Sequence, residues 1–218
     1  MQLRSAVMGA DGVLGEDVLL DRMTCSCCQT DAALTEDGLV VVYRDRSPED
    51  LRDIAILRRV EDVWSEPALV HADGWEIAGC PVNGPAVAAE GRRVGVAWFT
   101  GADNIPAVKV AFSEDSGQSF GTPVRVDLGQ PVGRVDAVMT PEGALLVSWV
   151  EWEGRSERLM LCEVTEAGCA EPWHVATNDA GSSVNFPRMA VTEEAIYLAW
   201  TQPQNGGGDR VQLVRRAR

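Results

Sequence analysis

The chain has few residues of several kinds, and each shortage narrows what it can be. No apolar run among its 218 residues approaches the 18 that a membrane-spanning helix needs. Residues 1–7 also lack the long apolar stretch of a secretory signal. Basic side chains number 19 against 33 acidic ones, which gives a net charge of −14. Such a charge repels nucleic-acid backbones and anionic membranes, so we expect neither as a partner.

Helical periodicity is lacking too, apart from a single turn expected near residues 48–51. A repeat of about 50 residues takes its place. Four apolar runs end in an aromatic residue at intervals of 55, 51 and 51 residues, namely at Tyr43, Trp98, Trp149 and Trp200. In each repeat a shorter apolar run precedes this one, and further runs follow. Short apolar runs bounded by Gly, Pro, Asp and Asn are typical of β-strands.

Four antiparallel strands per repeat predict a β-propeller, because one such sheet cannot cover both of its apolar faces whereas neighbouring blades bury one another. A stacked β-sandwich is the alternative, but it does not explain the recurring aromatic residue. We therefore expect one all-β propeller domain over residues 1–218. The predicted blades are 1–22 (half a blade), 31–73, 83–129, 134–179 and 187–218 (partial).

The strand count of this domain is incomplete. The first stretch has the pattern of strands three and four of a blade, and the last stretch supplies strands one to three of another. Joining the two would close the propeller poorly. We therefore expect upstream blades in a longer chain, of which these residues form the C-terminal four to five blades of a six-bladed propeller.

One turn of the repeat carries a specific motif. Residues 113–120 match S/T-x-D-x-G-x-x-W/F, the Asp-box, through Ser113, Asp115, Gly117 and Phe120. The Asp side chain caps the tight turn and Gly permits a positive φ. We expect a structural role for these four residues, and not a catalytic one.

With this box the chain resembles the sialidase-like propellers built from Asp-box (BNR) repeats. Three stretches, residues 24–30, 42–47 together with 52–54, and 74–85, are similar to a bacterial group of exo-α-sialidase-like proteins with a C-x-C-C-Q-T motif. The resemblance implies a six-bladed sialidase-like propeller, an exported protein and a function assigned by analogy with exo-α-sialidases. It implies an acidic carbohydrate as the ligand.

Candidate ligand-binding residues lie in the loops expected at one mouth of the propeller, which include 23–31, 74–84, 181–187 and 202–208. The candidates are Arg44, Asp45, Arg46, Arg52, Asp53, Trp75, Asn83, Arg134, Asp136 and Arg188. Arginine forks suit the carboxylates of sialic and uronic acids, and Trp75 would offer a stacking face. Alternatively, the charges in 44–46 and 52–53 pair with one another and only shape the loop.

Hydrolysis by the sialidase mechanism needs a tyrosine nucleophile. The two tyrosines, Tyr43 and Tyr197, both stand at positions typical of strands and not of mouth loops. We therefore expect a binding or structural module first, and a glycoside hydrolase acting on an acidic sugar second.

The sequence contains six cysteines, which form a second group of candidate site residues. Cys162 and Cys169 flank a short turn and are expected to face each other across it. The other four fall on two successive mouth loops: Cys25, Cys27, Cys28 and Cys80. Disulfides between these loops are one interpretation, suited to an oxidising compartment. A thiolate site for Zn²⁺ or copper, completed by His71, is the other, and it would make the chain a metal-binding protein.

Overall fold

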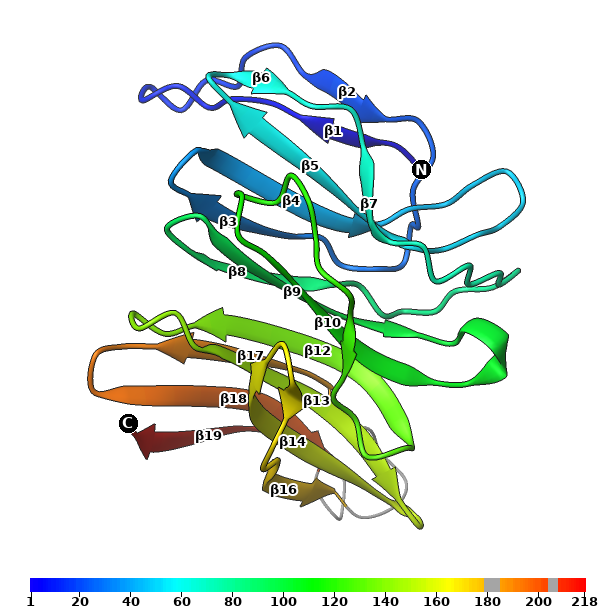
Figure 1. The fold of residues 1–218 in the computed structure, drawn as a ribbon, viewed down its shortest axis with the longest axis vertical. Coiled ribbons are helices and arrows are strands. Elements are labelled where there is room, and N and C mark those ends of the chain that lie inside the picture. Colours follow the sequence, from blue (N-terminus) through cyan, green and yellow to red (C-terminus); the bar gives the residue numbers. More distant parts are fainter. Residues whose placement is uncertain (179–184, 204–207) are drawn as a thin grey trace.

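The computed structural model describes residues 1–178, 185–203 and 208–218, and it is an all-β molecule. Its strands form five antiparallel sheets that follow one another along the long axis of the molecule (Figure 1). The one helical element of these described residues is a 3₁₀ turn, Ala102–Asn104. The described part of the chain contains no helix long and apolar enough to cross a bilayer.

The first three sheets come from the N-terminal part of the chain. The first consists of β1 (Leu3–Ser5) and β2 (Val18–Asp21). The second consists of β3 (Asp31–Thr35), β4 (Gly38–Arg44), β5 (Ile54–Val60), β6 (Val63–Trp64) and β7 (Ala68–His71). The third consists of β8 (Ala86–Glu90), β9 (Arg93–Thr100), β10 (Ala107–Ser113) and β11 (Val124–Arg125).

The last two sheets follow the same order. The fourth consists of β12 (Pro131–Met139), β13 (Leu145–Glu153), β14 (Ser156–Thr165), β15 (Gly168–Cys169) and β16 (Trp173–Asn178). The fifth consists of β17 (Asn185–Val191), β18 (Ala195–Pro203) and β19 (Asp209–Ala217). In the second sheet, β6 and β7 both pair with the outer side of β5. In the fourth sheet, β15 and β16 both pair with the outer side of β14.

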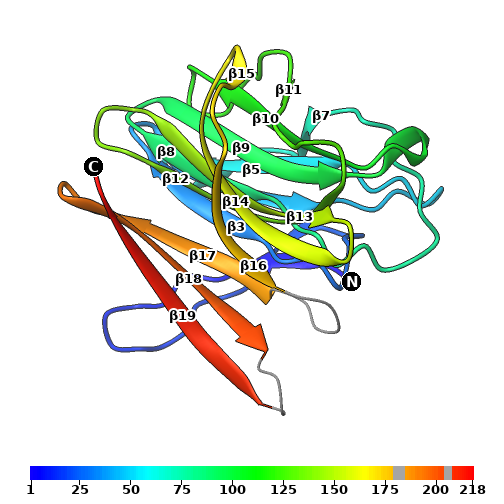
Figure 2. The ribbon, with the colours of Figure 1, turned by 90° about the horizontal axis from the view of Figure 1, so that it is seen from below.

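The sheets are arranged as successive propeller blades. Their first strands, β3, β8, β12 and β17, lie next to one another, and β19 forms the outer edge of the last sheet (Figures 1 and 2). The apolar cores lie between neighbouring sheets; one joins β8–β10 to β12–β14 and another joins β4 and β5 to β8 and β9. Neighbouring sheets bury their faces against one another, so the all-β fold is a partial β-propeller, as the repeat predicted.

The repeated aromatic residues fill these cores. Tyr43, Trp98, Trp149 and Trp200 stand in β4, β9, β13 and β18 and are all buried. Two of the indole groups donate to carboxylates, Trp98 Nε1 to Asp73 at 2.6 Å and Trp149 Nε1 to Glu151 at 2.7 Å. A buried indole with its N–H paired stabilises the fold through a large apolar area without leaving a polar group unsatisfied.

Two kinds of connection lie at opposite ends of the strands (Figure 1). The hairpins between first and second strands occupy one end. The turn at Gly38 has a φ of 142°, and a Cβ there would lie 2.1 Å from the Arg59 carbonyl oxygen, so only glycine fits. The longer loops between second and third strands, and between one sheet and the next, occupy the other end. We call this end the mouth.

The Asp-box turn connects β10 to β11. Asp115 accepts hydrogen bonds from the Ser119 backbone N–H at 2.9 Å and from the Ser119 hydroxyl at 2.6 Å. The Ser113 hydroxyl donates to Asp115 and accepts from the Gly117 N–H, where φ is 79°. Burial alone would raise the pKa of Asp115, but the hydrogen bonds from Ser119 and Ser113 outweigh it and lower the pKa to about 2. The motif therefore holds a turn, on the side of the sheet away from the mouth.

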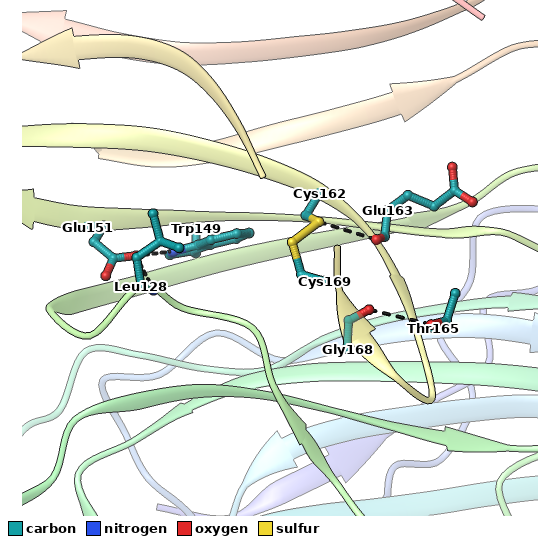
Figure 3. The surroundings of a disulfide bond; sticks show 8 residues. All are labelled: Leu128, Trp149, Glu151, Cys162, Glu163, Thr165, Gly168 and Cys169. Atoms are coloured by element: carbon teal, nitrogen blue, oxygen red, sulfur yellow. Dashed lines mark hydrogen bonds between the residues drawn. A yellow bond between two sulfur atoms is a disulfide. The ribbon is translucent and has the colours of Figure 1, made fainter. Parts of the chain in front are cut away.

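A disulfide closes the turn between β14 and β15. Cys162 and Cys169 are bonded, with their Cα atoms 6.1 Å apart, as the spacing across the turn predicted (Figure 3). The adjacent register pairs Val164 with Cys169 and Thr165 with Gly168. The bond joins the short β15 to the buried β14, so that the outer part of this blade is covalently fixed.

Candidate functional site

The mouth loops of the first three sheets interlock. Isolated bridges join Thr24 to Asp45 and Leu51 to Glu76. The Gln29 amide also exchanges two hydrogen bonds with the backbone of Gly84, at 3.2 and 2.9 Å. A Cβ at Gly84 would lie 2.1 Å from the Gln29 carbonyl oxygen, so this close approach requires glycine. Loops that are distant in sequence therefore form one surface.

Asn83 connects this surface to the fourth sheet. Its side-chain oxygen accepts the Arg134 backbone N–H at 2.7 Å, and its amide donates to the Val132 carbonyl at 3.1 Å. Its own carbonyl accepts Arg44 Nε at 2.7 Å. Asn83 is buried, so its polar atoms serve the scaffold of the mouth.

Arg44 is the most deeply placed of the candidate arginines, with 2% of the residue exposed. Its guanidinium donates to the carbonyl oxygens of Asn83, Arg52 and Phe99. It also lies 4.9 Å from the centre of the Trp75 ring. Burial lowers the pKa of Arg44, while the neighbouring Cys28 and Cys25 act against that shift. Its donors are committed to the main chain and not to a ligand.

The loop between β4 and β5 satisfies its own charges. Arg46 Nε and Arg52 Nη2 both reach Asp50 Oδ1, at 2.8 and 3.1 Å. Asp53 is buried and accepts the backbone N–H groups of Gly74 and Trp75. The side-chain ion pairs of Arg46 and Arg52 therefore run to Asp50, which was not a candidate, and not between the charges of 44–46 and 52–53.

Trp75 is only 8% exposed and lies against Phe99, with ring centres 5.5 Å apart. The structure does not give it the open ring face that stacking on a ligand needs. Trp75 instead packs beneath the mouth, between Phe99 and the Arg44 guanidinium.

Tyr43 lies between the first two sheets, and Asp45 directly follows β4. The Tyr43 hydroxyl donates to Asp21, and burial together with that carboxylate strongly raises the pKa of Tyr43. Burial also raises the pKa of Asp45, with a contribution from Asp21. Tyr43 packs with Leu3, Leu20 and Trp64. A tyrosine buried in this way is not placed to attack a sugar.

Three of the four mouth cysteines form a cluster. Cys25 Sγ lies 3.0 Å from Cys28 Sγ and 3.6 Å from Cys27 Sγ, and all three sulfurs lie within 4.8 Å of one another. Burial raises the pKa of the Cys28 thiol to about 12, and the hydrogen bond with Cys25 acts in the same direction. The cluster is a group that could hold a metal ion.

Cys80 and His71 do not belong to that cluster. Cys80 is an exposed free cysteine. His71 lies 3.8 Å from Asp73 and 6.5 Å, ring to ring, from Trp98. Arg52 does reach the cluster, with Nη1 donating to Cys25 Sγ at 3.4 Å. The three sulfurs therefore have the Arg52 guanidinium beside them, and neither Cys80 nor His71 supplies a fourth ligand.

Asp136 and Arg188 form an ion pair where β12 meets β17. Arg188 Nη1 lies 3.1 Å from Asp136 Oδ1, and the side chain of Arg188 is 63% exposed. Asp136 is buried and also accepts the Met189 backbone N–H. Burial raises the pKa of Asp136 to about 6, although the Met189 N–H and Arg188 favour the charged form.

Arg134 lies next to this pair. Its Nη1 is 3.7 Å from Glu157 Oε2, and its guanidinium lies 6.0 Å from the centre of the Phe186 ring. Its side chain is 18% exposed.

A pocket of about 240 Å³ opens at the mouth beside Arg188. It is lined by Cys27, Gln29, Val82, Val135, Phe186, Pro187 and Arg188. Gln29, Val82 and Phe186 were not among the candidates from sequence, although Gln29 belongs to the C-x-C-C-Q-T motif. A larger groove of about 460 Å³ lies at the hairpin end, between the last two sheets, where Arg216 covers the Trp173 ring. Residues 181–184 and 204–207 of the expected mouth loops lie outside the described residues.

Solved structures share this fold at low sequence identity, whereas no protein-family model and no curated protein sequence matches the chain. The Hadza microbial sialidase Hz136 has 17% identity and a TM-score of 0.56, over 85% of this chain and 43% of that one. Trypanosoma rangeli sialidase has 13% identity and a TM-score of 0.53, over 98% of this chain and 41% of that one.

Proteins with other names share the fold as well. A Dyadobacter fermentans protein of unknown function has 12% identity and a TM-score of 0.58, over 89% of this chain and 65% of that one. A xylan β-1,4-xylosidase from Bacillus halodurans has 11% identity and a TM-score of 0.54, over 89% of this chain and 41% of that one. The fold is therefore a partial β-propeller, similar to those of two sialidases and a xylosidase, and the chain spans about two fifths of the length of the two sialidases.

Proposed function

We propose that the mouth of this partial propeller binds a small ligand with a carboxylate group, an acidic sugar, in the pocket beside Arg188. One observation carries the proposal. Arg188 lines the pocket and has a side chain that is 63% exposed, while Arg44 and Arg52 are buried and donate within the protein. Among these three arginines, Arg188 is the one that a ligand can reach.

The chemistry of the pocket suits such a ligand. A guanidinium has five donors in a planar fork and pairs with a carboxylate through two parallel hydrogen bonds. The Asp136 carboxylate fixes one end of the Arg188 group, at 3.1 Å, which limits the rotamers that binding must freeze. Phe186 and Val82 supply apolar wall for the less polar face of a sugar ring.

The structural comparisons support the same class of ligand. Two of the solved structures that share the fold are named as sialidases, and one of T. rangeli sialidase is described as a complex with sialic acid. Sialic acid carries a carboxylate, the group that Arg188 is suited to pair with.

Hydrolysis of an acidic glycoside is the second candidate, and one observation favours it. Asp136 has a pKa raised to about 6, which suits a general acid or base near neutral pH. Against it, Tyr43 is buried and paired with Asp21. Release of the fluorophore from a fluorogenic sialoside, abolished in Asp136→Asn, would replace binding with hydrolysis as the function.

Calorimetric titration with N-acetylneuraminic acid and with its methyl ester tests the binding proposal. The acid should bind and the ester should bind at least tenfold more weakly, because esterification removes the charge that Arg188 pairs with. The Arg188→Met variant should bind the acid at least tenfold more weakly than the unaltered chain does. The matched control is Arg92→Met: Arg92 also has a half-exposed side chain and one ion pair, to Asp37 at 3.3 Å, but it lies in a hairpin turn away from the mouth.

Three results would contradict the proposal. They are equal affinity for acid and ester, equal loss in Arg188→Met and Arg92→Met, and no binding of the acid by the unaltered chain.

A further inference from the structure

The cluster of Cys25, Cys27 and Cys28 has the dimensions of a metal site. Three sulfurs that share one ion at a metal–sulfur distance of 2.3 Å lie about 4 Å apart. The sulfurs here are 3.0 and 3.6 Å apart for two pairs and no more than 4.8 Å for the third. Small rotations of the cysteine side chains would therefore bring all three to a common ion.

The surroundings of the cluster are cationic. Arg52 donates to Cys25 Sγ at 3.4 Å, and Arg44 interacts electrostatically with Cys28 and Cys25. The hydrogen bonds of Arg44 go to main-chain carbonyls and not to a carboxylate. Arg52 is 5% exposed, and its Nε has no hydrogen-bond partner among the described residues. Burying guanidinium groups is costly unless negative charge lies close by.

Asp50 pairs with Arg52 Nη2 at 3.1 Å and Asp53 acts on Arg44, and thiolates bound to a metal ion would add negative charge on the side of the cluster. Three thiols alone do not, because a neutral S–H group is only a weak hydrogen-bond partner. Coordination replaces the three protons with one metal ion and leaves the cluster anionic, next to the two guanidinium groups. The contact of Arg52 Nη1 with Cys25 Sγ and the grouping of the three sulfurs thus point to the same missing component.

The number of ligands selects the ion. The described residues that form the group are three cysteines, with Cys80 and His71 outside it. Structural zinc sites use four protein ligands, and cubane or rhombic iron–sulfur clusters use four cysteines. Monovalent copper is a soft ion that prefers thiolates and is complete with three of them.

We propose that Cys25, Cys27 and Cys28 bind one Cu(I) ion in a trigonal thiolate site, held against the guanidinium groups of Arg52 and Arg44. Three S–H bonds break, three Cu–S bonds form and three protons pass to solvent, and no electron is transferred. Cys27 also lines the mouth pocket, so the copper site forms part of its wall. The proposal is independent of the acidic sugar and is tested without one.

The experiment uses the whole chain, reduced with dithiothreitol, desalted and kept under nitrogen. A chromogenic Cu(I) chelator loaded with copper is titrated with the protein. The protein should withdraw one Cu(I) per chain from the chelator. Its affinity for Cu(I) should fall at least 100-fold in each of the single variants Cys25→Ser, Cys27→Ser and Cys28→Ser.

Two control variants keep the cluster intact. Cys80→Ser removes the exposed cysteine, and the double variant Cys162→Ser/Cys169→Ser removes the thiols that reduction of the disulfide releases. Both should bind as tightly as the unaltered chain. Binding that persists when Cys25, Cys27 and Cys28 are all replaced, or that is lost in Cys80→Ser, would overturn the proposal.

A second measurement on the unaltered protein covers the case in which a variant does not fold. With Cu(I) bound, iodoacetamide should modify Cys80 in the native protein and leave Cys25, Cys27 and Cys28 unmodified. X-ray absorption should show three sulfur neighbours. Four-coordination, a nitrogen neighbour or alkylation of the cluster at the rate seen without copper would contradict the trigonal site.

Discussion

Two buried side chains, Arg44 and Asn83, determine how the mouth is built at the scale of single residues. Arg44 ties the carbonyl oxygens of three separate segments together, and Asn83 fastens the same region to β12. Both were candidates for ligand contact because charged and amide groups in a loop are typical of binding sites. Sequence shows which groups can donate, but whether a guanidinium faces a ligand or a carbonyl depends on contacts between segments 39 to 55 residues apart.

We expect Arg44→Met to lower the free energy of unfolding by about 3 kcal/mol or more, because it removes a buried donor group and leaves three carbonyl oxygens without partners. Arg46→Met is the control, because Arg46 is partly exposed and makes one surface ion pair with Asp50. It should change stability by about 0.5 kcal/mol. Urea denaturation measures both, and similar losses in the two variants would contradict the scaffold role of Arg44.

Asp136 should make the free energy of unfolding depend on pH. Its pKa is about 6 in the folded protein against an ordinary value of 3.8, so between these pH values the folded state holds a proton that the unfolded state has lost. The free energy of unfolding should therefore fall as pH rises from 4 to 6, by about 2 kcal/mol from this group. Asp136→Asn should abolish that part of the dependence.

Chemical denaturation of both proteins at pH 4.0 and 6.5 provides the measurement, with the difference between the proteins isolating Asp136 from other carboxylates. Asp115, whose pKa is lowered to about 2, contributes chiefly below this range. A difference that stays constant with pH would mean that Asp136 titrates normally.

Secondary-structure elements were the most predictable level. The recurring aromatic residue placed β4, β9, β13 and β18 because a buried second strand needs a large apolar side chain between neighbouring sheets. The division of the outer strand into β6 and β7, and into β15 and β16, did not follow from the pattern. Outer strands are short and partly exposed, so their apolar periodicity is weak.

The Asp-box turn gives a prediction at this scale. Asp115→Ala removes the acceptor of the hydrogen bonds from Ser119 and Ser113. We expect a loss of about 1–2 kcal/mol in stability with no change in ligand binding, because the turn lies away from the mouth. Thermal unfolding and calorimetric titration measure the two effects. A loss of binding in folded Asp115→Ala would give the motif a functional role after all.

The disulfide between β14 and β15 gives a second prediction at this scale. Cys162 and Cys169 close a loop with a sequence separation of 7. Chain-entropy arguments give a short loop of this size about 2 kcal/mol of stabilisation. Cys162→Ala/Cys169→Ala should lose that amount in urea denaturation, whereas Cys80→Ala, at an exposed free cysteine, should lose almost none. Equal stability of all three proteins would show that the bond constrains little.

At the scale of the whole molecule, five sheets form an arc of blades whose cores lie between sheets. This arrangement explains why the sequence predicted the fold better than the site. Strand patterns are local, but the pocket at the mouth unites residues from two loops between sheets and from β12 and β17, including Gln29, Val82 and Phe186, which no local motif connects. Cys25, Cys27 and Cys28 are close in sequence and could be grouped from it, whereas Cys80, which was expected with them, lies outside their cluster.

Chemical-shift mapping tests whether loops from separate blades form one ligand pocket at the mouth. With ¹⁵N-labelled protein and N-acetylneuraminic acid, we predict shifts concentrated at the backbone amides of Cys27, Gln29, Val82, Val135 and Arg188, which come from different sheets and loops. Shifts centred on Trp173 and Arg216, in the larger groove at the hairpin end, would contradict the account, as would no shifts at all.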